Sequence, residues 1–204
     1  MDKETTHKSS LRTKADRAKQ FRSKNLIAVL ENPNNMKNIW AIIRNINALG
    51  VEKLYIIDSK GIIPKNWEDM REKRTLVYTS VWAVKRSFVK TFKTTQECID
   101  HLKENRFVSV VTSPHVKWKK NILLDEWNYT QIRLAVRFGN ESHGISDLAV
   151  EASEACINIE MWWITESFNL AVSTGIVLYE VTKQRRKYQK ENKRWWKSSQ
   201  DFLK

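Results

Sequence analysis

The sequence is poor in the residues that mark several classes of protein. Its two cysteines, Cys98 and Cys156, form no CxxC pair, and its four histidines are scattered, so neither a disulfide framework nor a metal site is expected. No apolar run approaches the roughly 20 residues that span a bilayer. The N-terminus also lacks the apolar segment of a secretory signal. We therefore expect a cytoplasmic protein that binds no metal and no membrane.

Glycine and proline are also scarce, with five and three residues in a chain of 204. Neither of the glycine-rich patterns Walker A and GxGxxG occurs. Their absence disfavours a protein that binds ATP or a dinucleotide through such a loop.

Positive charge, in contrast, is abundant. Lysine and arginine total 36 against 23 acidic residues, which gives a formal net charge of +13. A soluble domain this basic usually binds a polyanion, because each phosphate that it neutralises releases counterions. Nucleic acid is the expected partner. A solvated basic surface without a partner and an anionic membrane surface are the alternatives.

The basic residues are concentrated toward both ends of the chain. We expect a basic N-terminal extension over residues 1–24, a folded domain over 25–186 and a basic C-terminal tail over 187–204. The tail contains Trp195 and Trp196, which either stack on a base or pack against a dimer partner. Lys and Arg contacts to phosphates would let these ends position a folded RNA.

Within the central region, short apolar runs alternate with helical patterns. Strands are expected at residues 26–30, 53–57, 107–112, 132–138 and 156–159, and helices at 36–49, 94–103 and 168–186. Gly50 is the expected C-cap of the first helix, Thr94 opens a capping box with Glu97, and Ser167 is the expected N-cap of the last helix. This alternation predicts an α/β fold with a mainly parallel sheet and a ligand site beyond the carboxyl ends of its strands.

Two stretches that follow strands are candidates for that site. Residues 138–146 read FGNESHGIS and hold two of the five glycines, with Glu141 between them; an ordinary tight turn is the alternative. Residues 157–170 lead through a bulky loop into the last helix, where Ser167 and Asn169 stand at an N-terminus that favours a carboxylate or a phosphate. Plain helix capping by Ser167 is the alternative there.

A third stretch lies on the first predicted helix. Asn38 and Arg44 are six residues apart, and Arg44 stands beside Ile43 on an apolar pattern. Because an unpaired buried charge is costly, an arginine there is expected to have a partner. A structural salt bridge, for example to Glu141, is the alternative to a functional role.

Together these stretches closely resemble the three motifs of the SpoU-type, TrmH-like branch of the SPOUT RNA methyltransferases. The family shows Asn…Arg on its first helix, then FGxExxGhS, then IPMxGxxxSLN. Here the corresponding runs are NIWAIIRNINALGV, FGNESHGIS and IEMWWITESFNLAVSTGIVLYE. The resemblance covers roughly residues 25–186. The runs SVWAVKRSFVKTF and LYEVTKQRRKY look most like the branch that acts on the D loop of tRNA.

The resemblance implies AdoMet-dependent 2′-O-methylation of ribose in a structured RNA, with the D-loop guanosine of a tRNA as the expected target and rRNA as the alternative substrate. It further implies a homodimer and a C-terminal trefoil knot that forms the S-adenosyl-L-methionine site, although knots are otherwise nearly absent from proteins. Arg44, Glu141 and Asn169 would be catalytic, with Asn38 and Ser167 supporting them. The pocket for S-adenosyl-L-methionine would be lined by Thr112, Gly139, Ile159, Met161 and Phe168.

The sequence departs from the family pattern at four positions. Trp40 stands where a small residue is usual, Glu160 replaces the proline of IPM, Trp163 replaces the following glycine, and Phe168 replaces the leucine of SLN. Trp163 is expected either to stack on the adenine or to fill part of the pocket. Trp40, Glu160 and Trp163 favour the alternative function, a catalytically inactive RNA-binding module on a methyltransferase scaffold. The motif residues that are intact argue against it: Arg44, Glu141, Ser167 and Asn169.

Overall fold

The computed structural model describes Thr13 and residues 22–63, 87–115 and 120–192. The predictions about the two basic ends, and about Trp195 and Trp196, fall almost entirely outside these residues. The same holds for the first part of the run at residues 80–92.

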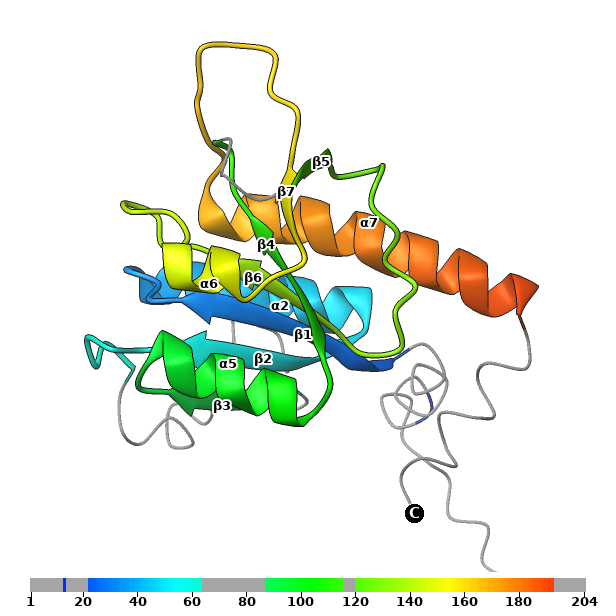
Figure 1. The fold of residues 1–204 in the computed structure, drawn as a ribbon, viewed down its shortest axis with the longest axis horizontal. Helices are drawn as coiled ribbons and strands as arrows, with labels where there is room; N and C mark the ends of the chain where they lie inside the picture. The colour runs from blue at the N-terminus through cyan, green and yellow to red at the C-terminus, as the bar shows by residue number, and fades with distance from the viewer. Residues whose placement is uncertain (1–12, 14–21, 64–86, 116–119, 193–204) are drawn as a thin grey trace, which may run out of the picture.

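The described residues form one parallel sheet between two layers of helices (Figure 1). Its seven strands run in the order β3-β2-β1-β6-β4-β7-β5, and every adjacent pair is parallel. The strands are β1 (Ser23–Glu31), β2 (Val51–Ile57), β3 (Phe88–Phe92), β4 (Val108–Thr112), β5 (Asn121–Leu123), β6 (Leu134–Phe138) and β7 (Ala155–Asn158). The helices are α2 (Met36–Leu49), α5 (Thr95–Glu104), α6 (Asp147–Glu151) and α7 (Leu170–Glu191).

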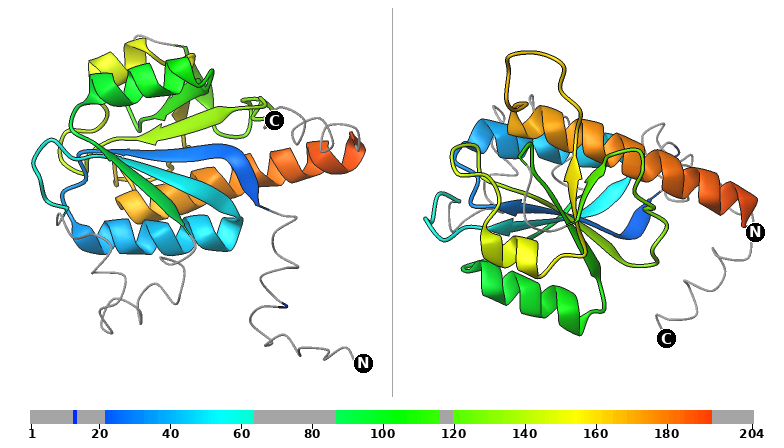
Figure 2. Two further views of the ribbon diagram at one scale, coloured as in Figure 1. Left: turned by 90° about the horizontal axis from the view of Figure 1, so that it is seen from below. Right: turned by 45° about the horizontal axis from the view of Figure 1, so that its top comes forward.

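Figure 2 shows α2 and α7 on one face of the sheet and α5 and α6 on the other. Three cores follow from this layering. The larger core packs alternate residues of the central strands against α2 and α7, and on the other face a smaller core packs against α5 and a third packs Val111 and Cys156 against α6. Strand β1 is covered on both faces, and Leu26 to Leu30 are fully buried. A central parallel strand therefore reads as a continuous apolar run.

Most of the predicted elements are confirmed, with differences at the ends. The predicted helix 36–49 matches α2, and Gly50 caps it in the left-handed conformation, with a φ of 78°. The Thr94 side chain accepts a hydrogen bond from the backbone N–H of Glu97, as a capping box requires. Strands β3 and β5 and helix α6 were not predicted. Each has five residues or fewer, too few for a clear period.

The predicted N-cap of the last helix is wrong. Helix α7 begins at Leu170, and its N-cap is Asn169, whose side chain accepts from the backbone N–H groups of Ala171 and Val172. Ser167 lies two residues before this cap and is exposed. Asparagine caps a helix about as well as serine does, so the capping rule alone did not separate the two residues.

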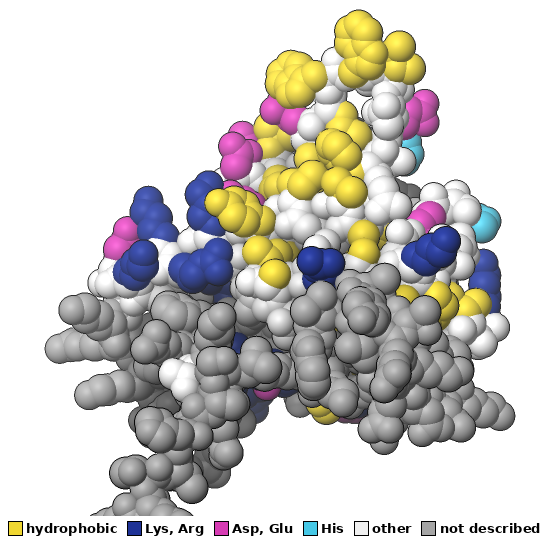
Figure 3. Space-filling model, turned by 180° about the vertical axis from the view of Figure 1, so that it is seen from behind, with side chains coloured by type: hydrophobic (Ala, Val, Ile, Leu, Met, Phe, Trp, Pro, Cys, Tyr) yellow, Lys and Arg dark blue, Asp and Glu magenta, His cyan; other side chains and the backbone are white. Residues whose placement is uncertain are grey.

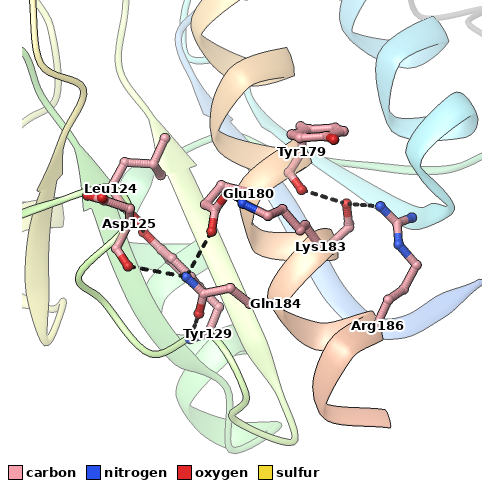
Figure 4. Close-up of polar contacts among 9 residues, drawn as sticks. Leu124, Asp125, Tyr129, Tyr179, Glu180, Lys183, Gln184 and Arg186 are labelled. Carbon is pink, nitrogen blue, oxygen red and sulfur yellow. Dashed lines mark hydrogen bonds and ion pairs between the residues drawn. The ribbon is translucent and has the colours of Figure 1, made fainter. Parts of the chain in front are cut away.

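The far half of α7 holds the segment that precedes β6. Arg185 is 3% exposed and donates to the backbone oxygens of Tyr129 and Gln131, at 3.0 and 2.6 Å. Figure 4 shows the neighbouring contacts, in which Gln184 lies against Asp125 and Tyr129. Strand β6 begins just after this segment, at Leu134 instead of at the predicted residue 132. In the described parts of the chain, no helix is both long and apolar enough to cross a membrane.

Candidate functional site

A cleft of about 440 Å³ opens at the carboxyl ends of β4, β6 and β7. These strands are neighbours in the sheet, in the order β6-β4-β7, so the segments that follow them converge at one edge. This is where a ligand is expected in an open parallel sheet. Eight residues with predicted roles line the cleft: Thr112, Gly139, Glu141, Ile159, Met161, Ser167, Phe168 and Asn169.

One wall of the cleft is a tight loop closed by its own backbone. Asn140 and Gly144 exchange two backbone hydrogen bonds, of 2.8 and 2.9 Å, and Gly144 has a φ of 68°. A Cβ atom on Gly139 would lie 2.2 Å from the carbonyl carbon of Gly144. The two glycines are therefore needed for the loop to fold back on itself, and the fold leaves the backbone of residues 138–145 along the cleft.

A chain of polar side chains crosses the opening of the cleft. Asn169 donates from Nδ2 to Oδ1 of Asn38 at 3.1 Å, and Asn38 donates from Nδ2 to Oε1 of Glu141 at 2.7 Å. The other carboxylate oxygen of Glu141 accepts from the backbone N–H of Asn34 at 2.8 Å. Because the Oδ1 atom of Asn169 caps α7, its amide group must face Asn38 through nitrogen. The capping bond thus fixes the direction of the whole chain.

Two residues of this network, Asn34 and Asn140, were not predicted. Asn140 accepts through Oδ1 from the backbone N–H groups of Ser142 and His143, and it donates to Oδ1 of Asn34 at 3.0 Å. It also donates to the backbone oxygen of Asn32. These bonds join the loop after β1 to the loop after β6. The signal in the sequence was the run Asn32-Pro33-Asn34, but its use requires knowing that β1 and β6 are neighbours.

The family is decided by a comparison with protein-family models. Residues 25–179 match the model of the SpoU rRNA Methylase family. The chain belongs to this family. The match spans the predicted domain from its first strand into α7, and it agrees with the resemblance of the three motifs.

Characterised members of the SpoU family resemble the chain over most of its length. A tRNA (guanosine(18)-2′-O)-methyltransferase of Aquifex aeolicus is 31% identical over 166 residues, 80% of this chain and 72% of that protein. A 23S rRNA (adenosine(1067)-2′-O)-methyltransferase of Streptomyces azureus is 31% identical over 154 residues, 76% of this chain and 53% of that protein.

Solved structures of SpoU proteins share the fold. The A. aeolicus TrmH/SpoU tRNA modifying enzyme has a TM-score of 0.71 and 27% identity, and covers 93% of this chain and 98% of its own. The SpoU methyltransferase AviRb from Streptomyces viridochromogenes, solved with AdoMet, has a TM-score of 0.67 at 22% identity, over 80% of this chain and 59% of its own. The mixed α/β architecture with a parallel sheet is therefore that of SpoU enzymes.

The environment predicted for the SpoU-motif arginine is wrong. Arg44 is exposed on α2 and is absent from the residues that line the cleft. The argument from an unpaired buried charge therefore does not apply to it. The hydrogen bonds that hold the Glu141 carboxylate come from Asn38 and Asn34. Six residues, or about 1.7 helical turns, separate Arg44 from Asn38, so the two side chains leave α2 in different directions.

The departures from the SpoU pattern leave the cleft open. Trp40 is buried in the larger core, at 5% exposure. Trp163 is 83% exposed and does not line the cleft, so of its two expected roles the filling of part of the pocket is wrong, while stacking on the adenine stays a prediction. Trp162 and Ile164 are equally exposed, on the loop between β7 and α7 that projects at the top of Figure 1. Figure 3 shows hydrophobic side chains gathered on that projection.

Metal chemistry finds no support at this edge of the sheet. Among the residues that the structure describes, His, Cys, Asp and Glu side chains form no group of three that could hold a metal ion.

Proposed function

We propose that this chain transfers a methyl group from S-adenosyl-L-methionine to a ribose 2′-hydroxyl of a structured RNA, and that its substrate is the D-loop guanosine of a tRNA. The observation that carries the proposal is the chain Asn169–Asn38–Glu141 across a cleft lined by the residues of the family motifs. tRNA is preferred to rRNA because the match extends over 72% of the tRNA enzyme from A. aeolicus and 53% of the rRNA enzyme.

The cleft fits a cofactor of this kind. Its volume of about 440 Å³ lies in the range of roughly 300–1,000 Å³ that is usual for small-molecule sites. Thr112, Gly139, Ile159, Met161 and Phe168 would hold S-adenosyl-L-methionine, with the tight glycine loop offering backbone groups to its polar atoms. When bound, this cofactor supplies a methyl group on a sulfonium, which is activated toward a nucleophilic oxygen.

The residues at the opening would then orient the ribose. The amides of Asn38 and Asn169 fix each other and the Glu141 carboxylate, so a hydroxyl group that enters the cleft meets a preset acceptor. Ser167 stands at the same opening and can donate to the RNA or the cofactor. Arg44 would hold the phosphate beside the target and orient the 2′-hydroxyl.

The position of Arg44 supports a homodimer. Arg44 lies outside the cleft of its own chain, so an arginine of a second copy is the simplest way to complete the site. Exposed apolar side chains beside the cleft, from Trp162 to Ile164 and at Val172, offer a surface for such a contact. We therefore propose that each cleft of a symmetric dimer takes Arg44 from the partner.

Complementation tests the dimer. Arg44→Ala and Glu141→Ala should each be inactive alone. Coexpression should restore about a quarter of the wild-type activity, because half of the dimers are mixed and each mixed dimer has one intact site. If Arg44 acts within its own chain, the mixture stays inactive. Asn47→Ala, also on α2, is the matched control and should stay active in every combination.

The remaining predictions follow from the family. We infer that the last part of the 25–186 domain forms a trefoil knot around the cofactor site, and that the basic ends, 1–24 and 187–204, position the RNA. A tRNA substrate is consistent with a cytoplasmic location. Deletion of residues 1–24 should flatten the salt dependence of RNA binding, because it removes phosphate contacts.

Calorimetry with S-adenosyl-L-methionine separates the proposed enzyme from an inactive RNA-binding module. We expect micromolar binding by the native chain, because Trp40 is buried in the core and Trp163 lies outside the cleft. Absence of binding, with tRNA present or absent, would favour the inactive module.

A further inference from the structure

A buried carboxylate lies beneath the glycine loop, on the face of the sheet opposite α2 and α7. Glu31, the last residue of β1, is 3% exposed. Its Oε1 atom accepts from the hydroxyl groups of Ser146 and Thr95, at 2.6 and 2.5 Å, and its Oε2 atom accepts from the backbone N–H of Ser146 at 3.3 Å. Glu31 thus ties the starts of α5 and α6 to the end of β1.

The contact with Ser146 reaches the cleft directly. Ser146 is the N-cap of α6, and it follows Ile145, which lines the cleft. The loop that begins with Phe138 and Gly139 therefore ends on the carboxylate of Glu31. Its path is short and closed by the bonds between Asn140 and Gly144, so a shift of Ser146 must move the backbone along the cleft.

The other end of the same loop carries a buried positive charge. Arg137 immediately precedes Phe138 and is fully buried. Its Nε and Nη2 atoms make no hydrogen bond within the described residues. Arg137 pairs with Val29 across β1, so Glu31, two residues along the same face, is its diagonal neighbour.

Glu31 is the acidic residue whose charge acts on Arg137. Burial lowers the pKa of Arg137, while Cys98 and Glu31 raise it. Burial raises the pKa of the Cys98 thiol to about 11, so this thiol is neutral near pH 7 and supplies no countercharge. The carboxylate of Glu31 is then the balancing group, and a buried charge without one is strongly unfavourable.

We infer that Glu31, balanced by Arg137, is a positioning residue that holds both ends of the glycine loop and so sets the shape of the cofactor cleft. The expected effect of Glu31 on the binding of S-adenosyl-L-methionine rests on the proposed function. Glu31 touches neither the cleft nor the polar chain at its opening, so its effect must pass through Ser146 and the loop backbone.

A pair of serine variants isolates this effect. Ser146→Ala removes a hydroxyl bonded to Glu31, whereas Ser153→Ala removes a hydroxyl just beyond the other end of α6, bonded to Ser109 and to the backbone of Ala149. We expect Ser146→Ala to weaken cofactor binding about tenfold, since it loses a cap and a charge-assisted bond. It should raise the KM for S-adenosyl-L-methionine with little change in kcat. Ser153→Ala should lower the melting temperature without changing either constant.

The charge pair is tested by rescue. Glu31→Gln leaves the guanidinium of Arg137 without its countercharge and should weaken cofactor binding. The double variant Glu31→Gln/Arg137→Leu removes both charges and should recover at least half of the loss on a logarithmic scale. If the losses of cofactor affinity in Glu31→Gln and in Arg137→Leu alone simply add in the double variant, the inference is overturned.

Amide hydrogen exchange gives a readout that needs no cofactor. Exchange over residues 139–145 should accelerate in Ser146→Ala and in Glu31→Gln, and should stay at the native rate in Ser153→Ala. Equal exchange in the two serine variants would overturn the inference. If the native chain binds no S-adenosyl-L-methionine, the proposed function fails, while this comparison still decides the role of Glu31.

Discussion

Replacement of Asn38 by alanine tests the polar chain at its central link. The substitution removes the 2.7 Å bond to the Glu141 carboxylate and the 3.1 Å bond from Asn169. A hydrogen bond to a charged group contributes about 1.5–3 kcal/mol. The lower part of that range applies, because Asn38 is only half-buried and Glu141 is exposed. With roughly 2 kcal/mol lost from the transition state, kcat/KM should fall about 30-fold.

The assay is transfer of labelled methyl groups from S-adenosyl-L-methionine to unmodified tRNA under single-turnover conditions. Stability should hardly change, because alanine favours a helix more than asparagine does and the lost bonds are partly exposed. Asn47→Ala, on the same helix and away from the cleft, is the control for that gain in propensity. If Asn38→Ala transfers methyl groups within threefold of the native rate at an equal melting temperature, the hydrogen bonds of Asn38 do not contribute to catalysis.

Three further substitutions probe the cleft and the fold. Gly139→Ala should weaken cofactor binding at least about 30-fold, because its Cβ would lie 2.2 Å from backbone, whereas Gly175→Ala, with a nearest contact of 3.2 Å to a side chain, should bind normally in calorimetry. Trp163→Gly should leave cofactor affinity within about threefold, since the indole is 83% exposed outside the cleft; tenfold tighter binding would show that it obstructs the site. Arg185→Met should cost about 2–4 kcal/mol in urea unfolding, because it leaves buried carbonyl groups unpaired. Lys183→Met, which breaks the surface ion pair of Lys183 with Glu180, should leave the unfolding midpoint nearly unchanged.

The fold class could be predicted from the sequence because each long element has its own local signal. The apolar run at Leu26–Leu30 predicts a strand buried on both faces, and the period of α2 together with Gly50 fixes that helix at both ends. Strands β3 and β5 have no such signal, because they are short and, apart from Phe92, their side chains are exposed or only partly buried. Their place comes from pairing with β2 and β7, which is a tertiary property.

The candidate site, too, could be predicted in part from the sequence. Eight of the ten predicted residues line one cleft, because the motifs stand at strand ends that a parallel sheet must bring to one edge. Asn38 joins them through hydrogen bonds. The exposed position of Arg44 could not be read from the motif, and Asn140 is reached only through the strand order, which places β1 beside β6. The proximity of the buried residues Glu31 and Arg137 could not be predicted for the same reason.

The most direct test of the account is to map the methyl group on RNA. Unmodified tRNA and rRNA fragments would be incubated with the native protein and S-adenosyl-L-methionine, and 2′-O-methylated nucleotides located by resistance to alkaline hydrolysis and by mass spectrometry. We expect a single 2′-O-methylguanosine in the D loop of tRNA, absent with Glu141→Ala. Methylation of rRNA alone, of a base instead of a ribose, or of no RNA despite cofactor binding would contradict it.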